Sequence, residues 1–217
     1  MRVGLIRALT TSNRRILHAH GDLLAGSFGF EVLTRCVPDQ PFGVYDDVSF
    51  RAAAPKVAAL AQDMADGVDA LIISCCADPG LTETRAVLDI PVIGAGSAAA
   101  AAALAFGGRA GVLGLTHQAP GPIAEASGTE CCSSMGPTVP GTPEGFLTPT
   151  GIFDALAQAH MLVDAGAEVI VQGSTGLSSI GMTAVLRDRL GVPVIDPVTA
   201  AGSVLLSGAG RRPAHAG

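Results

Sequence analysis

The sequence has little of what marks several common classes of protein. It contains no Trp, 4% aromatic residues and only 15% charged residues, and its formal net charge is −6. This acidic balance argues against nucleic acid or an anionic membrane as a partner. No apolar run approaches the roughly 20 residues that span a bilayer, and the start of the chain lacks the apolar core and cleavage site of a signal peptide. We therefore expect a cytoplasmic protein.

The sequence also lacks the spacings typical of metal and nucleotide sites. Its five cysteines stand at positions 36, 75, 76, 131 and 132, with no CxxC, and its five histidines do not fall at metal-ligand spacings. Neighbouring cysteines bridge each other only with strain, so no disulfide framework is indicated. GxGxxG and Walker patterns are absent, which argues against a bound nucleotide. We expect no metal site, and free thiols that are available for chemistry.

What the chain does contain is a regular alternation of strands and helices. Hydrophobic residues make up 48% of 217 residues, enough to bury a substantial core. The strands are expected at 3–9, 30–36, 69–74, 91–93, 110–115, 168–172 and 193–195, with a further short one near Cys131. The helices are expected at 14–24, 50–66, 82–88, 97–106, 118–126, 150–165, 179–190 and 199–207, the sixth capped by Thr150.

This alternation predicts an α/β protein made of two pseudo-symmetric three-layer α/β domains, each with a mainly parallel sheet of about four strands. The first half should span residues 1–107, and its last helix has the option of packing on the second half, which spans 108–208. Residues 209–217 read as a flexible tail. Residues 127–149, rich in Gly, Pro, Ser and Thr, read as a surface excursion or lid. A homo-oligomer formed through an Ala-rich helix face stays open.

One stretch occurs twice. In Asp69–Gly80 and again in Glu168–Ser179, an acidic residue opens an apolar strand, and a small nucleophilic side chain follows six positions later. These side chains are Cys75 and Ser174. Each copy leads through a helix-sized segment to a Pro-Val-Ile strand. We interpret the copies as equivalent strand ends of two halves, facing one another across a cleft at the interface, because ligands of parallel sheets bind beyond the carboxyl ends of the strands.

Cys75 is the first candidate for chemistry. A thiol between a strand end and a helix N-terminus meets free N–H groups and the positive end of a dipole, so we expect its pKa to be lowered. The alternative is a small buried hydrophobe, as most free cysteines are. Cys76 points the other way if the strand alternation continues, and ranks second.

Other candidates lie near strand ends. Arg7 would pair with a substrate carboxylate or imide oxygen, or serve as a structural cation near Asp46 or Asp78. Threonines at strand ends would bind substrate or cap a helix. The remaining candidates for substrate binding are Thr10, Ala77, Asp78, Gly96, Ser97, Thr116, Thr175 and Gly176. His18 and His20 are expected to be solvated on a surface helix.

Taken together, several motifs resemble the aspartate/glutamate/hydantoin racemase superfamily, and its hydantoin racemase branch in particular. They are Gly-Leu-Ile-Arg near the start, the Ser-Cys75-Cys-Ala-Asp-Pro-Gly segment, Ile-Pro-Val-Ile-Gly-Ala-Gly-Ser97, Gln-Gly-Ser174-Thr-Gly-Leu and Gly-Val-Pro-Val-Ile-Asp196-Pro. The resemblance implies two similar α/β domains with the site between them and a racemisation that needs no cofactor. It also implies that two cysteines flank the carbon, one removing and one delivering a proton.

Cys75 matches the first of these cysteines, and Ser174 stands where the second is expected. A serine hydroxyl is a poor substitute for a thiol that abstracts a carbon-bound proton. Three explanations are open: an engineered Cys-to-Ser change, a natural one-thiol racemase, or chemistry that has moved to decarboxylation of a malonate-type acid, with Cys75 as the sole proton donor. We predict a racemase or epimerase acting on a hydantoin or an amino acid. The alternatives are that decarboxylase and a non-catalytic binder of a small carboxylate.

Overall fold

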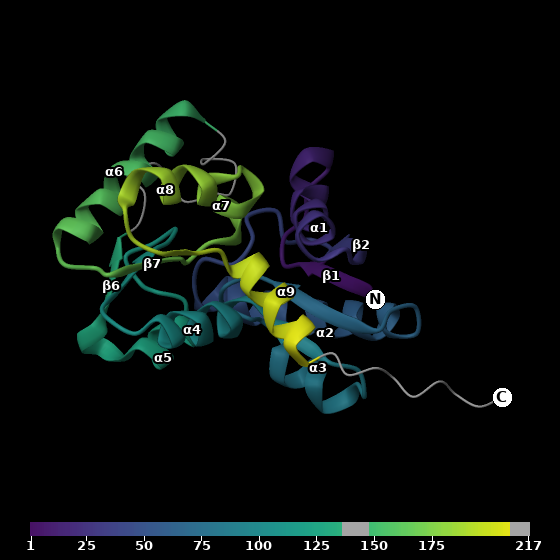
Figure 1. Cartoon of the computed structure of the whole chain (residues 1–217). Coiled ribbons are helices and arrows are strands. Elements are labelled where there is room, and N and C mark those ends of the chain that lie inside the picture. Colours follow the sequence, from purple (N-terminus) through teal and green to yellow (C-terminus); the bar gives the residue numbers. More distant parts are fainter. Residues whose placement is uncertain (136–147, 209–217) are drawn as a thin grey trace.

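The structure is a computed structural model that describes the backbone of residues 1–135 and 148–208 and the side chains of residues 1–126 and 148–208. Two parallel sheets of four strands form two lobes, each sheet built from one half of the sequence (Figure 1). The predicted fold class, α/β with parallel sheets, is confirmed. Residues 136–147, which hold most of the expected excursion or lid, and the expected tail at 209–217 lie outside the described residues.

The first sheet contains β1 (Arg2–Arg7), β2 (Glu31–Cys36), β3 (Ala70–Ser74) and β4 (Val92–Gly94) in the order β2-β1-β3-β4, all parallel. Strand β3 is buried along its whole length. Strands covered on both faces consist of continuous apolar residues, which explains why these segments could be recognised in the sequence.

The second sheet repeats this arrangement. It contains β5 (Ala110–Leu113), β6 (Cys132–Met135), β7 (Val169–Gln172) and β8 (Val194–Ile195) in the order β6-β5-β7-β8. Strand β6 is the short strand expected near Cys131. The two orders correspond strand for strand, so β3 and β7 occupy equivalent places. The two copies of the repeated stretch therefore end at equivalent points of the two sheets.

Helices cover both faces of the first sheet, giving three layers. On one face, α2 (Asp47–Ala65) and α3 (Leu81–Val87) pack on β1 and β3 through residues such as Leu60 and Ile73. On the other face lies α1 (Arg14–Phe28), whose Leu24 packs with Leu5 and Ile72. Alternate strand residues face opposite layers.

The second sheet is covered in the same way. One face carries α6 (Pro149–Asp164), α7 (Thr175–Ser179) and α8 (Met182–Leu190), which pack against residues such as Ile170. The other face carries α5 (Gly121–Cys131).

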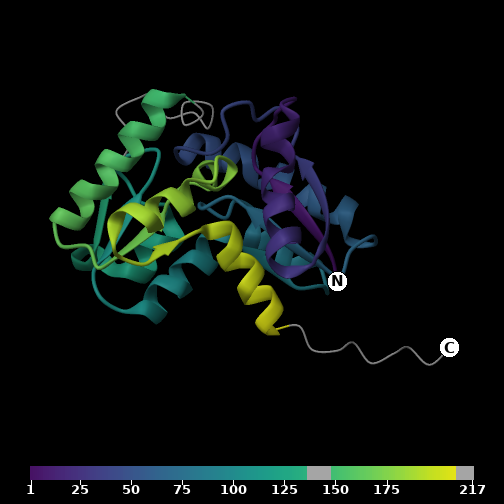
Figure 2. The ribbon, with the colours of Figure 1, turned by 45° about the horizontal axis from the view of Figure 1, so that its top comes forward.

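Two helices are exchanged between the halves. Helix α4 (Ala95–Phe106) follows β4 of the first sheet, but its Ala99, Ala100 and Ala103 pack with β5 and β7 of the second. Helix α9 (Pro197–Gly208) follows β8 of the second sheet and packs on the first, beside α1 (Figure 2). This exchange buries apolar surface between the halves. It also covers one Ala-rich helix face, that of α4, and a homo-oligomer formed through an Ala-rich face stays a prediction.

Capping decides where two helices begin. Helix α2 starts at Asp47 rather than at the expected Phe50, because Asp46 and Ser49 form a capping box. Helix α6 is capped by Thr148, not by the expected Thr150, and Pro149 fits its first turn.

The helix expected over 179–190 is in fact two helices, α7 and α8. Gly181, which lies between them, has φ 69°, a left-handed conformation that glycine adopts without steric cost. Helix α7 begins directly after Ser174 and lies within the second copy of the repeated stretch. In the described part of the chain, no helix combines the length and the apolar character needed to cross a bilayer.

Candidate active site

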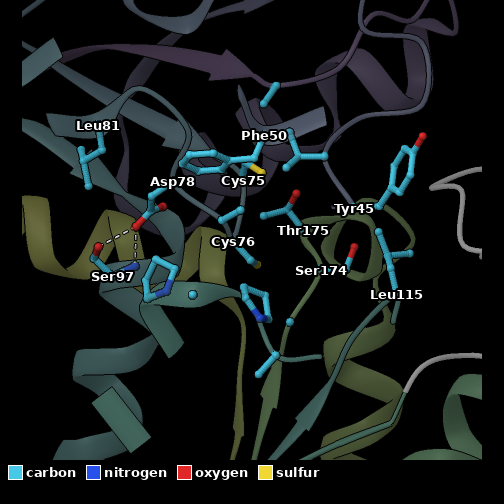
Figure 3. A pocket seen from close by; sticks show the side chains of 18 of the residues that line it. Tyr45, Phe50, Cys75, Cys76, Asp78, Leu81, Ser97, Leu115, Ser174 and Thr175 are labelled. Carbon is cyan, nitrogen blue, oxygen red and sulfur yellow. Dashed lines mark hydrogen bonds between the residues drawn. The ribbon is translucent and has the colours of Figure 1, made fainter. Parts of the chain in front are cut away.

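A cavity of about 970 Å³ opens at the carboxyl ends of the strands and is lined by residues of both halves. Cys75 follows β3 directly, and Ser174 follows β7 after one intervening glycine. Both side chains line this cavity, and Figure 3 shows them with Thr175 between them in that view. The structure thus brings the two repeated stretches to one site.

The surroundings of the Cys75 thiol favour its protonated form. Burial raises the pKa of Cys75 to about 12, and the nearby Asp78 carboxylate adds to the rise. The main-chain N–H groups of Ala77 and Asp78 point at the sulfur and oppose this shift without reversing it. The sequence-based expectation of a lowered pKa was therefore wrong, because it considered helix-end N–H groups and left out desolvation.

Ser174 is buried and serves as the N-cap of α7. Its hydroxyl oxygen accepts a hydrogen bond from the N–H of Gly176 at 3.2 Å. Thr175 and Gly176 follow it along the cavity wall. The capping role considered for Thr175 belongs to Ser174, and the Thr175 hydroxyl instead faces the carbonyl of Ser74 at 3.4 Å.

Cys76 also lines the cavity but is almost fully buried. Its thiol donates to the carbonyl of Gln172 at 3.6 Å, across the junction between the halves. Burial raises the pKa of Cys76 well above its ordinary value, and the neighbouring Cys75, Asp78 and Asp196 raise it further. This thiol has the character of a packing group.

Asp78 closes the N-terminus of α4. Its carboxylate accepts from the main-chain N–H groups of Gly96 and Ser97 and from the Ser97 hydroxyl (Figure 3). Asp78 and Ser97 line the cavity, whereas Gly96 does not. A Cβ on Gly96 would lie 2.0 Å from the carbonyl oxygen of Cys76, so this position requires glycine for close approach. The amides expected to bind substrate at this point are thus occupied by Asp78.

Ala77 and Thr116 lie on the cavity wall as expected, and Arg7 and Thr10 do not. The Arg7 guanidinium is buried and donates to the carbonyls of Ile16 and Leu17 in α1. Burial lowers the pKa of Arg7 to about 10. Thr10 is exposed, and its hydroxyl donates to the carbonyl of Val37 at 2.7 Å. Both side chains are therefore engaged in holding the first lobe together.

His20 is the main residue that the sequence reasoning misplaced. It was expected to be solvated, but it is fully buried between the halves, while His18 is exposed. Burial and the charge of Arg7 lower the pKa of His20 well below its ordinary value. The available signal was helical spacing: Ile16, His20 and Leu24 recur every four residues and so share the buried face of α1.

An apolar wall was also missed. It is formed by large side chains from loops and helix ends, which lie far apart in the sequence and meet only in the complete fold. Its members are Phe42, Tyr45, Phe50, Leu81, Leu104 and Leu115. Figure 3 labels four of them, Tyr45, Phe50, Leu81 and Leu115. A ligand with an apolar substituent would find a matching surface there.

The charges on the cavity wall are mostly negative. Asp46, Asp47, Asp78 and Glu125 contribute carboxylates, and Arg85 contributes the one cation among the lining residues that the structure describes. The Nε of Arg85 already donates to the carbonyl of Val92 at 2.9 Å. Within the described residues, no group of His, Cys, Asp and Glu is placed to hold a metal ion.

Comparison with known proteins agrees with this architecture. A model of the Asp/Glu/hydantoin racemase family matches residues 14–204. A hydantoin racemase from Paenarthrobacter aurescens is 31% identical over 142 residues, which cover 61% of this chain and 58% of that protein. The chain thus matches less than two thirds of that relative's length.

Solved structures share the fold. An allantoin racemase from Pseudomonas fluorescens superposes with a TM-score of 0.83 at 23% identity, covering 95% of this chain and 90% of its own. A double mutant of arylmalonate decarboxylase in its liganded form superposes with a TM-score of 0.68 at 16% identity, covering 98% and 95%. The match of the family model over most of the sequence shows that the chain belongs to the Asp/Glu/hydantoin racemase family.

Proposed function

We propose that the protein is a cofactor-independent racemase or epimerase that inverts the acidic carbon of a 5-substituted hydantoin. The observation that carries this proposal is that Cys75 and Ser174, from equivalent strand ends of the two halves, line one cavity. Inversion of a carbon needs a base and an acid on opposite faces, and two pseudo-symmetric halves can supply one each. The hydantoin racemase relative supports the same reaction class.

The proposed step begins with Cys75 as thiolate. The carbon–hydrogen bond breaks, its proton passes to the sulfur, and the electron pair moves onto the adjacent ring carbonyl. The opposite face then receives a proton from a water molecule that the Ser174 hydroxyl holds by a hydrogen bond and that exchanges with solvent. The hydroxide that remains takes up a proton released from the Cys75 thiol through solvent, which restores the starting state.

The charge of the cavity supports a neutral substrate. Carboxylates outnumber the single Arg85 among the described lining residues, so glutamate, which has two carboxylates and a net negative charge, would be repelled. A hydantoin ring is neutral in its ordinary form, and its substituted carbon lies between a ring nitrogen and a ring carbonyl, which acidifies the hydrogen of that carbon. We therefore favour hydantoins over free amino acids, with an apolar 5-substituent on the wall that includes Phe50 and Leu115.

Decarboxylation of a malonate-type acid is the second candidate, and the raised pKa of Cys75 favours it. In that reaction the carbon–carboxylate bond breaks, carbon dioxide leaves, and the resulting enolate takes the proton of the Cys75 thiol. A thiol that stays protonated at neutral pH is suited to this donor role. The acidic wall weighs against it, because a malonate carries two negative charges.

One set of measurements separates these readings. The purified protein is incubated with one enantiomer of 5-benzylhydantoin in deuterated water and, separately, with phenylmalonate. Its melting temperature is measured with and without each compound. Cys75→Ala serves as the control in every assay. Loss of optical rotation with deuterium at the ring carbon, absent in Cys75→Ala, supports racemisation. Release of carbon dioxide from phenylmalonate would overturn the racemase proposal in favour of the decarboxylase. If neither reaction occurs but the ligand raises the melting temperature, the protein is a binding module, and both enzymatic proposals are overturned.

We also propose the cytoplasm as the location. Cys36, Cys75 and Cys76 are free thiols, and the chemistry requires Cys75 to stay reduced.

A further inference from the structure

We infer that His20 is a positioning residue that sets the separation between the Cys75 and Ser174 segments. The inference rests on the proposed function, because it assigns His20 a part in the same site. It is carried by a single buried side chain in hydrogen-bond contact with both chain segments.

The contacts of the imidazole are made to the immediate neighbours of the candidate pair. Its Nδ1 lies 2.8 Å from the hydroxyl of Ser74, the residue before Cys75. Its Nε2 lies 2.7 Å from the carbonyl oxygen of Thr175, the residue after Ser174. The ring thus spans the gap between the carboxyl ends of β3 and β7, one from each half.

The partners determine the protonation of the ring. A carbonyl oxygen only accepts, so Nε2 must carry the hydrogen that is donated to Thr175. Nδ1 is then free to accept from the Ser74 hydroxyl. The Ser179 hydroxyl lies 2.8 Å from Nε2 and within 3.4 Å of the Arg7 guanidinium. The neutral ring satisfies both chain segments at once.

His20 is presented by a rigid element. Helix α1 is anchored to the first lobe by Ile16 and Leu24, both buried, and by Arg7, which donates to the carbonyls of Ile16 and Leu17. The second lobe reaches the ring through Thr175 and Ser179 of α7. A shift of α7 relative to α1 would break these contacts, so the ring links the position of Ser174 to that of the first sheet.

The expected consequence is catalytic. Proton transfer requires donor, carbon and acceptor to be aligned, and a displacement of about 1 Å can lower a rate by about 10²-fold. Loss of the imidazole would leave the Ser74 hydroxyl and the Thr175 carbonyl without this partner. The Cys75 and Ser174 segments would then relax independently.

The test compares His20→Leu and His20→Gln with His18→Leu and His18→Gln, which alter an exposed histidine of the same helix. All four are made in the wild-type chain and in a Ser174→Cys background, and racemisation of 5-benzylhydantoin is followed. For His20→Leu we expect kcat to fall about 10²-fold with KM changed less than about threefold. His20→Gln should recover part of the loss, because its amide can donate to Thr175. The His18 variants should match their parent.

Hydrogen exchange provides a readout independent of activity. In His20→Leu, amide exchange should increase in both 74–78 and 174–179, and neither segment should change in His18→Leu. A kcat within twofold of the His18 control, or a rise in KM alone, overturns the inference. Faster exchange confined to α1 would indicate a merely structural role and also overturns it. If no variant racemises the substrate, the proposed function fails, and the exchange pattern still decides the role of His20. If His20→Leu does not fold, His20→Gln carries the comparison.

Discussion

Replacing Ser174 by cysteine should increase racemisation. The substitution puts a thiol where the family resemblance places a second cysteine, in a buried position on the wall of the cavity. A thiol is a much stronger acid than a serine hydroxyl or a water molecule bound to it, so it delivers a proton to a carbanion more readily. The variant should therefore exchange the α-hydrogen of a hydantoin faster than the wild type does.

The size of the gain follows from acidity. The pKa of an ordinary cysteine thiol is about 8.5. The pKa of bulk water, which approximates that of an alcohol such as serine, is about 15.7. If burial raises the pKa of the new thiol as far as that of Cys75, about 12, the gap narrows to about four pKa units. A Brønsted slope of about 0.5 converts this gap into a rate gain of about 10²-fold, within the usual range for general acid catalysis.

The substitution also has a cost in stability. Ser174 accepts the N–H of Gly176 as the cap of α7, and sulfur is a weaker acceptor. Loss of a cap costs about 1 kcal/mol, which lowers the melting temperature of a chain of this size by about 2–4 °C. The variant should therefore be folded at assay temperature, so a change in rate can be attributed to chemistry.

The assay follows optical rotation and deuterium incorporation in parallel, and Ser178→Cys is the matched control. Ser178 is a buried serine of the same helix that is not part of the cavity wall. A rate for folded Ser174→Cys no higher than that of Ser178→Cys, with Cys75 intact, would refute the assignment of the pair.

Three further predictions concern the same site. Cys75→Ala should lower kcat/KM by about 10³-fold. Cys76→Ala removes a thiol that makes a packing contact, and its kcat/KM should stay within about tenfold of the wild-type value. Equal losses in the two variants would contradict the assignment of chemistry to Cys75 and packing to Cys76. Because the pKa of Cys75 is raised to about 12, the rate of racemisation by the thiolate should increase about tenfold per pH unit from pH 7 to 10, once the rate of Cys75→Ala is subtracted. The rate of decarboxylation, which uses the thiol, should not increase. A racemisation rate independent of pH would exclude the thiolate as the base. Gly96→Ala should lower the free energy of unfolding, measured by denaturant, by about 2 kcal/mol, because the new Cβ meets the Cys76 carbonyl. Gly26→Ala, with open space around it in α1, should raise the free energy of unfolding by about 0.5–1 kcal/mol. Similar effects of the two substitutions would contradict the packing argument.

The fold could be predicted because parallel strands that are covered on both faces consist of apolar runs, and helical segments separate these runs in the sequence. Cys75 and Ser174 could be found because ligand sites of such sheets lie beyond the carboxyl ends of strands, and both residues follow the same repeated pattern. Strand order and the packing of α9 on the first half could not be read in this way, and the packing of α4 on the second half was foreseen only as an option. They depend on which apolar faces meet, and alanine-rich helices fit several partners.

The rest of the site depends on side-chain packing between distant segments. The direction of the shift in the Cys75 pKa could not be foreseen, because the desolvation that dominates it depends on how the complete fold buries the thiol. Arg7 stands at a strand end as expected but turns to the carbonyls of α1. The apolar wall comes from loop and helix-end residues whose positions follow only from the complete fold.

Duplication brings two strand ends together but does not by itself hold them at a catalytic distance. Helices α4 and α9 join the halves through apolar packing, which is non-directional and tolerates small sliding. Hydrogen bonds at 2.7 and 2.8 Å are directional and weaken steeply when displaced. The exchanged helices therefore account for the stability of the pair of lobes, and the accuracy of the site must come from contacts such as those of His20. Changes in the apolar face of α9 should lower stability more than kcat, whereas changes in His20 should do the reverse.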